Sequence, residues 1–149
     1  MVIRWIMAAL HLLALGIGLG AVWARRQALR QAPDEQAIRR ALYADTAWGI
    51  AALLWISTGL ARAFGGLAKG TTYYVTNHVF WTKMALLALI LVLEVWPAAT
   101  LVRWRIGLGR GKAIDTSRAG TFAIISTVQA ALVVAMVFAA TAMARGFGH

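Results

Sequence analysis

The chain has no cysteine, two prolines and five acidic residues in a length of 149. Without cysteine it can form neither disulfides nor thiolate metal sites. Proline is scarce and no segment alternates polar and apolar residues, so helices are the expected regular structure. The scarcity of acidic residues leaves a formal net charge of +10, which any account of the protein must explain.

Long apolar runs fill most of the chain, and 61% of its residues are hydrophobic. Each run is close to the roughly 20 residues that a helix needs to cross a bilayer core. The expected spans are 5–24, 46–63, 79–102 and 119–144. Only helices and closed barrels satisfy their backbone in lipid, so we predict an all-α integral membrane protein. A single four-transmembrane-helix bundle would then occupy residues 1–149 as one domain.

The first apolar run is longer than the apolar core of a secretory signal. Arg25 and Arg26 follow it, and we interpret them as the cytoplasmic stop that ends a retained span.

The positive charge gathers in two of the segments that join the spans. Five basic residues follow the first span and five follow the third: Arg25, Arg26, Arg30, Arg39 and Arg40, then Arg103, Arg105, Arg110, Lys112 and Arg118. The positive-inside rule places both loops in the cytoplasm and both termini outside, in a bacterial inner membrane. Charge that is split between short juxtamembrane loops suits anionic lipid head groups and does not suggest nucleic acid as a partner.

Besides Arg62 at the end of the second span, three ionisable residues lie within the spans: His11, Lys83 and Glu94. A charge at the centre of a transmembrane helix costs about 2.5–3.5 kcal/mol on the mildest scale, so such residues usually mark a site. His11 and Lys83 lie at similar depths from the outer end and are expected to face one another. Arg62 and His78 end and begin spans on the same side, which makes the outer half of the bundle a candidate cationic or metal-binding site.

Each of these residues also has a structural interpretation. His11 can hydrogen-bond a neighbouring helix, and Lys83 can extend to the outer surface. Glu94 is expected in the inner half with Asp45 and Arg103, where it needs either a partner or a neutral, proton-accepting state.

Helical periodicity adds three packing predictions. Gly18 lies on the same face as His11 and leaves space there for a ring-shaped ligand. Small residues four apart predict close helix packing at Gly16 and Gly20 on the first span, and along 127–139 on the fourth. A buried stripe is expected on the second span, at Asp45, Trp48, Ala52, Trp55, Gly59 and Arg62.

The runs at 9–16, 48–55, 62–70 and 77–84 read ALHLLALG, WGIAALLW, RAFGGLAKG and NHVFWTKM. Together they resemble a bacterial family of small predicted four-span membrane proteins of unknown function. The resemblance covers nearly the whole chain.

A more distant resemblance rests on the Ala-Leu-His of the first span, Thr58-Gly59 in the second and a Trp-x-Lys-Met opening of the third. This order is similar to HemJ-type protoporphyrinogen oxidases and to the CopD-like membrane domain. It implies b-type haem, with functional residues at the positions of His11 and Lys83. The chain departs from that pattern at Trp81, where the family has His, and at 94–96, where the family has Tyr-His.

Three classes of function follow. The first is a membrane oxidoreductase that binds haem b or a porphyrin, with quinone as a further possible partner. Its cofactor-binding residues would be His11, Arg62 and Lys83, its metal ligands His11 and His78, and its catalytic residues Lys83 and Glu94. The second is a small transporter or ion-handling protein. The third is a non-catalytic subunit that forms a homo-oligomer or joins a larger membrane complex.

Overall fold

Four long helices and one short helix make up the computed structural model, which describes residues 1–30 and 32–148. The long helices are α1 (Val2–Leu29), α2 (Glu35–Phe64), α4 (His78–Gly109) and α5 (Ala119–Ala144), and the short one is α3 (Thr71–Val75). All four long helices have the length and apolar composition to cross a membrane. The predicted four-span, all-helical fold is confirmed.

Three of the long helices, α1, α2 and α4, are longer than the predicted spans, mainly at the end that carries the basic loops, whereas α5 has the predicted bounds. α2 begins at Glu35 because Asp34 caps it, accepting a hydrogen bond from the Ala37 backbone N–H at 2.7 Å. Asn77 caps α4 in the same way, accepting from the N–H groups of Val79 and Phe80. Capping residues therefore set the first residues of α2 and α4. The apolar runs indicate only which part of each helix is suited to lipid.

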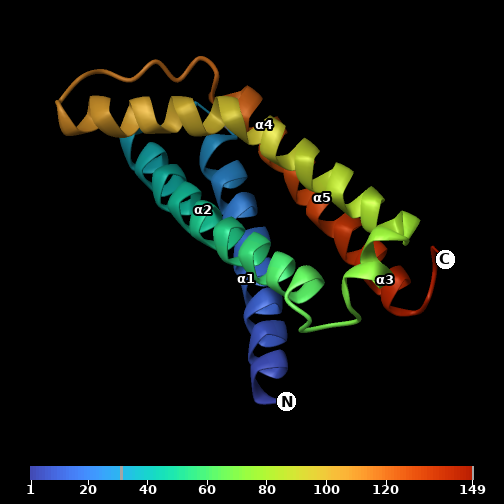
Figure 1. Cartoon of the computed structure of the whole chain (residues 1–149). Coiled ribbons are helices and arrows are strands. Elements are labelled where there is room, and N and C mark those ends of the chain that lie inside the picture. Colours follow the sequence, from blue (N-terminus) through green and yellow to red (C-terminus); the bar gives the residue numbers. More distant parts are fainter. Residues whose placement is uncertain (31, 149) are drawn as a thin grey trace.

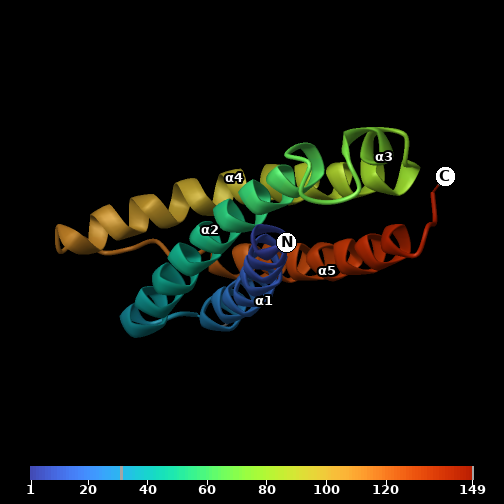
Figure 2. The same ribbon diagram turned by 60° about the horizontal axis from the view of Figure 1, so that its bottom comes forward.

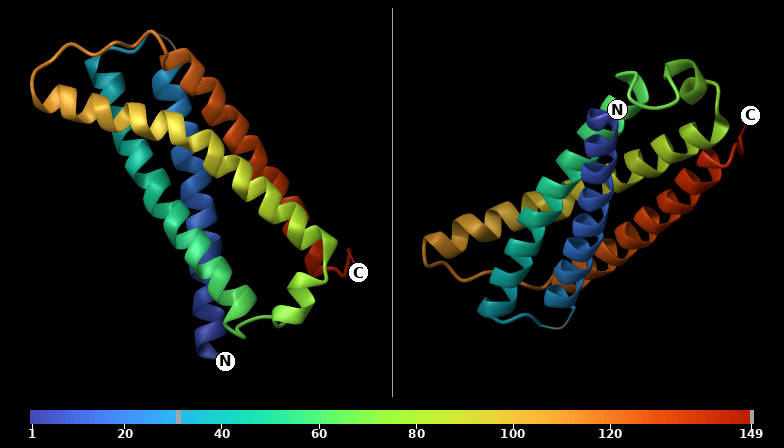
Figure 3. Two further views of the ribbon diagram at one scale, coloured as in Figure 1. Left: turned by 45° about the horizontal axis from the view of Figure 1, so that its top comes forward. Right: turned by 90° about the horizontal axis from the view of Figure 1, so that it is seen from below.

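The long helices form two pairs that spread apart. α1 packs along α2 and against α5, and α5 packs along α4, whereas α2 and α4 have little contact. Figures 1 and 2 show the two pairs meeting near the ends that carry the basic loops. They diverge toward the end that holds α3 and both termini, as the two views in Figure 3 make plain. The wide end is the outer end of the predicted topology.

The outside of the bundle is apolar. Large side chains such as Leu53, Val92 and Phe138 are about 70% exposed, as expected of residues that face lipid. The predicted small-residue contacts are wrong within this chain. A Cβ added at Gly16 or Gly20 would meet nothing within 4 Å, and residues 131 and 135 are exposed.

Close helix packing uses other glycines. A Cβ at Gly18 would lie 3.4 Å from Ala51 Cβ and 3.5 Å from the Trp48 ring. The space predicted beside Gly18 for a ring-shaped ligand is therefore filled by α2. Gly59 is the second close approach, since a Cβ there would lie 3.1 Å from His11 Cε1. The predicted buried stripe of α2 is confirmed, because all six of its residues are buried or half-buried.

The orientation of the bundle can be tested by labelling, because the chain has no cysteine of its own. We expect Thr71→Cys and Arg145→Cys to react with a membrane-impermeant thiol reagent in intact cells. Gln36→Cys and Gly109→Cys should react only after the membrane is opened. The reverse pattern would place the basic loops outside and the wide end of the bundle in the cytoplasm.

Candidate functional site

The inner half of the bundle is organised around Arg25 of α1, which is 0% exposed. Its Nη1 donates to Asp45 Oδ1 at 2.8 Å and to Glu94 Oε1 at 2.7 Å. Its Nη2 donates to Glu94 Oε2 at 2.9 Å and to Gln129 Oε1 at 2.7 Å, and its Nε donates to Ser126 Oγ at 3.0 Å. One guanidinium thus joins α1 to α2, α4 and α5.

Glu94 is held as a carboxylate by donors on three helices. Besides Arg25, Trp48 Nε1 donates to its Oε2 at 3.1 Å and Gln129 Nε2 at 2.7 Å. The same Gln129 amide nitrogen also donates to the Ile90 carbonyl oxygen. Since every one of these partners donates, the geometry favours an ionised, paired Glu94 over a neutral one.

The interpretation of Arg25 as a cytoplasmic stop is wrong. α1 continues to Leu29, and its buried face runs through residues 14, 18, 21, 22, 25 and 29. That helical spacing was the available signal, because it places Arg25 on the same face as the apolar residues. Arg26, on another face, is half-buried and donates to Thr127 Oγ1. The predicted grouping of Glu94 with Asp45 is confirmed, but Arg103 is exposed and does not join them.

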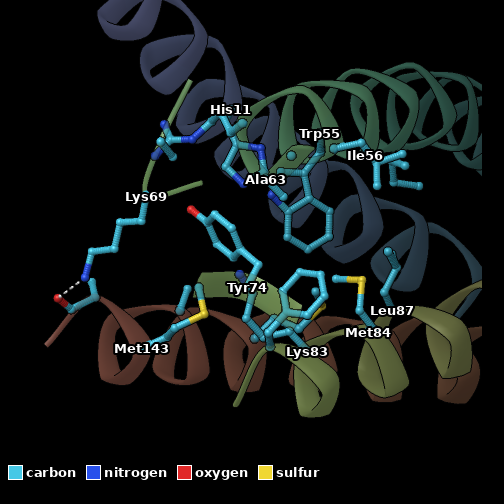
Figure 4. Close-up of a pocket in the computed structure, with 18 of the residues that line it drawn as sticks. His11, Trp55, Ile56, Ala63, Lys69, Tyr74, Lys83, Met84, Leu87 and Met143 are labelled. Atoms are coloured by element: carbon cyan, nitrogen blue, oxygen red, sulfur yellow. Dashed lines mark hydrogen bonds between the residues drawn. The ribbon is translucent and has the colours of Figure 1, made fainter. Parts of the chain in front are cut away.

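The outer half contains a cavity of about 450 Å³ between the two helix pairs. Its polar lining includes three of the predicted site residues, His11, Arg62 and Lys83. Its apolar walls come from all five helices and include Trp55, Tyr74, Phe80, Met84, Met136 and Met143. Figure 4 shows His11 and Trp55 on one side of the open space, with Tyr74, Met84 and Met143 across from them.

His11 is held in one orientation by α2. The Thr58 hydroxyl donates to the Leu54 carbonyl oxygen at 2.6 Å, so its lone pair accepts from the Nδ1–H of His11 at 2.9 Å. The imidazole proton is therefore on Nδ1, and Nε2 keeps its lone pair. The ring also lies beside the Trp55 indole, with 5.9 Å between ring centroids.

The cations of this cavity lack counter-ions. Within residues 1–30 and 32–148, no acidic side chain lies within ion-pair distance of Arg62 or Lys83. Both lie close enough to His11 for their charges to act on it. Positive charge without a partner in an apolar cavity is costly, so these groups suit an anionic ligand.

The segment between α2 and α4 covers the wide end of the cavity. Tyr73 donates its hydroxyl hydrogen to the Met143 carbonyl oxygen at 2.7 Å, and Lys69 donates to the Ala144 carbonyl oxygen. Asn77 is fully buried and donates to the Phe147 carbonyl oxygen at 3.0 Å. These contacts fix the segment to the end of α5, so the cavity has a defined outer wall.

Two predicted site residues lie elsewhere. His78 is exposed and does not line the cavity, so the structure does not bring it together with His11 as a metal pair. In the described part of the chain there is no group of three or more His, Cys, Asp or Glu side chains able to hold a metal ion. Glu94 belongs to the inner network and lines a second cavity of about 180 Å³ with Asp45.

The inner network should dominate stability. Arg25→Met would leave two carboxylates, 15% and 19% exposed, without their cation, and we expect a loss of about 3–5 kcal/mol in the free energy of unfolding. This loss can be measured by denaturing the purified protein and the variant in mixed micelles. Arg26→Met is the matched control and should cost under about 1 kcal/mol. Equal losses for the two variants would contradict the assignment.

The comparisons with known proteins give a family and no activity. The chain matches a family described as "Predicted membrane protein (DUF2214)" over residues 3–148. No curated protein and no solved structure matches it. A match over nearly the full length, on a chain with four helices long and apolar enough to span a membrane, shows that this protein belongs to the DUF2214 family of predicted membrane proteins.

Proposed function

We propose that this integral membrane protein binds an amphipathic ring ligand, haem b or a related porphyrin, in the outer cavity. The observation that carries the proposal is the juxtaposition of His11 Nε2, which retains a lone pair, with the unpaired cations Arg62 and Lys83 in one apolar cavity. A porphyrin has an apolar ring, a central metal position and two carboxylates, and these three features correspond to that lining.

The residues present fit such a ligand. A cavity of about 450 Å³ lies within the range of small-molecule and cofactor sites, which is roughly 300–1,000 Å³. His11 would hold the metal through Nε2, and Arg62 and Lys83 would pair with the carboxylates. His11 is the one histidine that lines the cavity, but Met84, Met136 and Met143 line it too, and a thioether is an established partner of His in haem ligation.

The proposed activity is membrane oxidoreduction, since bound haem supplies one-electron chemistry. In this proposal the chain holds the ring, orients it through the fixed imidazole and neutralises its carboxylates. Lys83 is the candidate for contact with a substrate. The inner network would serve as support, because the geometry of Glu94 leaves it saturated with donors. The positions of His11 and Lys83 also agree with the distant resemblance to HemJ-type oxidases.

Ion handling is the second candidate. The outer and inner cavities share three lining residues, Trp55, Ile56 and Leu87, so they adjoin along the weak α2–α4 contact. An ion path would run from Lys83 to Asp45. Proton-coupled or cation flux in proteoliposomes, abolished by Asp45→Asn, would favour this function over haem binding.

Haem binding can be tested directly by the visible spectrum. Protein from haem-sufficient membranes should show a Soret band that shifts on reduction. His11→Ala would remove the side chain proposed to hold the metal and should weaken haemin binding by at least about tenfold, or 1.4 kcal/mol. His78→Ala is the matched control and should bind as the wild type does. A folded, colourless protein that takes up no added haemin would remove haem and porphyrin from the proposal.

The role of the two cations can be separated from that of the imidazole. Arg62→Met and Lys83→Met should each weaken the binding of haemin by roughly 10- to 150-fold, as expected for the loss of one hydrogen bond to a charged group, about 1.5–3 kcal/mol. Neither substitution should change the affinity for haemin dimethyl ester, because both carboxylates of that molecule are esterified and carry no charge. Titrations followed at the Soret band give both sets of constants. If the variants weaken the ester as much as the acid, the cations act on the fold and not on the ligand.

A further inference from the structure

One polar atom in the interior has no partner. Within residues 1–30 and 32–148, Trp55 Nε1 is the buried side-chain nitrogen or oxygen that forms no hydrogen bond. A buried donor without an acceptor is destabilising, so native proteins rarely keep one without a use.

The chain offers two direct comparisons. Trp48 lies two turns earlier on the same stripe of α2, and its Nε1 donates to Glu94 Oε2 at 3.1 Å. Trp81 near the start of α4 donates to the Val75 carbonyl oxygen at 3.0 Å. An acceptor for an indole is therefore available in this bundle at other depths, and among the described residues Trp55 is the tryptophan whose N–H is both buried and without an acceptor.

The position of Trp55 points to a ligand. It lines the outer cavity, and its ring lies beside the His11 imidazole on the same wall. In Figure 4 both side chains border the open space of the cavity. The Nε1 atom itself is covered by neighbouring groups, so an oxygen on a molecule that fills the cavity reaches the unpaired N–H after the indole turns toward the cavity.

We infer that Trp55 is a ligand-binding residue whose indole N–H donates to a carbonyl or carboxylate oxygen of the molecule in the outer cavity. The inference rests on the proposed function, because it assumes that the cavity binds an amphipathic ligand. It adds a requirement to that function: the ligand carries an oxygen acceptor at the depth of Trp55, within the apolar part of the cavity. A porphyrin propionate and the ring carbonyl of a quinone both meet this requirement.

Trp55→Phe removes the donor and keeps an aromatic ring. In this variant the affinity for the ligand and the stability of the ligand-free protein should not fall together. The affinity for the ligand should fall by about 5- to 150-fold, which corresponds to one buried hydrogen bond. The thermal midpoint of the ligand-free protein in detergent should be unchanged or higher, since the variant has lost an unpaired donor. Trp48→Phe is the matched control, and its midpoint should fall because Glu94 loses a donor.

The probes are haemin and decylubiquinone. If only haemin binding weakens in Trp55→Phe, the acceptor is a carboxylate oxygen. If only quinone binding weakens, it is a ring carbonyl, and either result supports the inference. Labelling the indole nitrogens with ¹⁵N adds a direct measurement, because the Trp55 N–H proton should shift downfield when the probe binds.

The inference fails if Trp55→Phe binds both probes within twofold of the wild type, as expected if a water satisfies the indole. It also fails if the ligand-free variant is less stable than the wild type or does not fold, because the N–H then has an acceptor within the protein. If the wild type binds neither probe, the proposed function fails, and this inference fails with it. Probe binding that is insensitive to Trp55 overturns the inference alone.

Discussion

The arrangement of the helices depends on the hydrogen bonds of one side chain. Arg25 is fully buried, and its three nitrogens reach acceptors on each of the other long helices. A guanidinium has a fixed planar geometry, so its acceptors must lie at defined heights and angles. Apolar packing alone would allow helices to slide in lipid, where no hydrophobic force holds them together. The network fixes their register and thereby places His11 and Trp55 at the same level as Lys83.

The polar groups of the inner half have partners within the chain, whereas several of those in the outer half do not. In the inner half, Glu94 and Gln129 satisfy one another and Arg25, so the network needs nothing from outside the chain. In the outer half, Arg62 and Lys83 have no counter-ion and Trp55 has no acceptor among the described residues. A self-contained network indicates a structural role. The unpaired groups around the outer cavity are those that the proposed ligand would complete.

Sequence reasoning reached the fold and the outer site by different routes. The four spans followed from apolar length, and depth along ideal helices brought His11, Arg62 and Lys83 to one end. Sequence reasoning missed the buried position of Arg25, because two adjacent arginines after an apolar run are typical of the end of a span. It also misplaced the open space at Gly18, since helical angles give the face of a residue but not which neighbour fills it. The unpaired Trp55 could not be predicted, because the absence of an acceptor depends on every side chain around it.

The pairing of Arg25 with Asp45 has a consequence for how the protein assembles. Both residues belong to the first helical hairpin, α1 and α2, which leaves the ribosome before the second. That hairpin can enter the bilayer with its cation and anion already neutralising each other. Glu94 arrives later on α4, where it meets a guanidinium that still has donors to offer. The order of these three charges along the chain thus lets Glu94 find its counter-charge in a hairpin already made, so that no ion of the inner network has to wait alone in lipid.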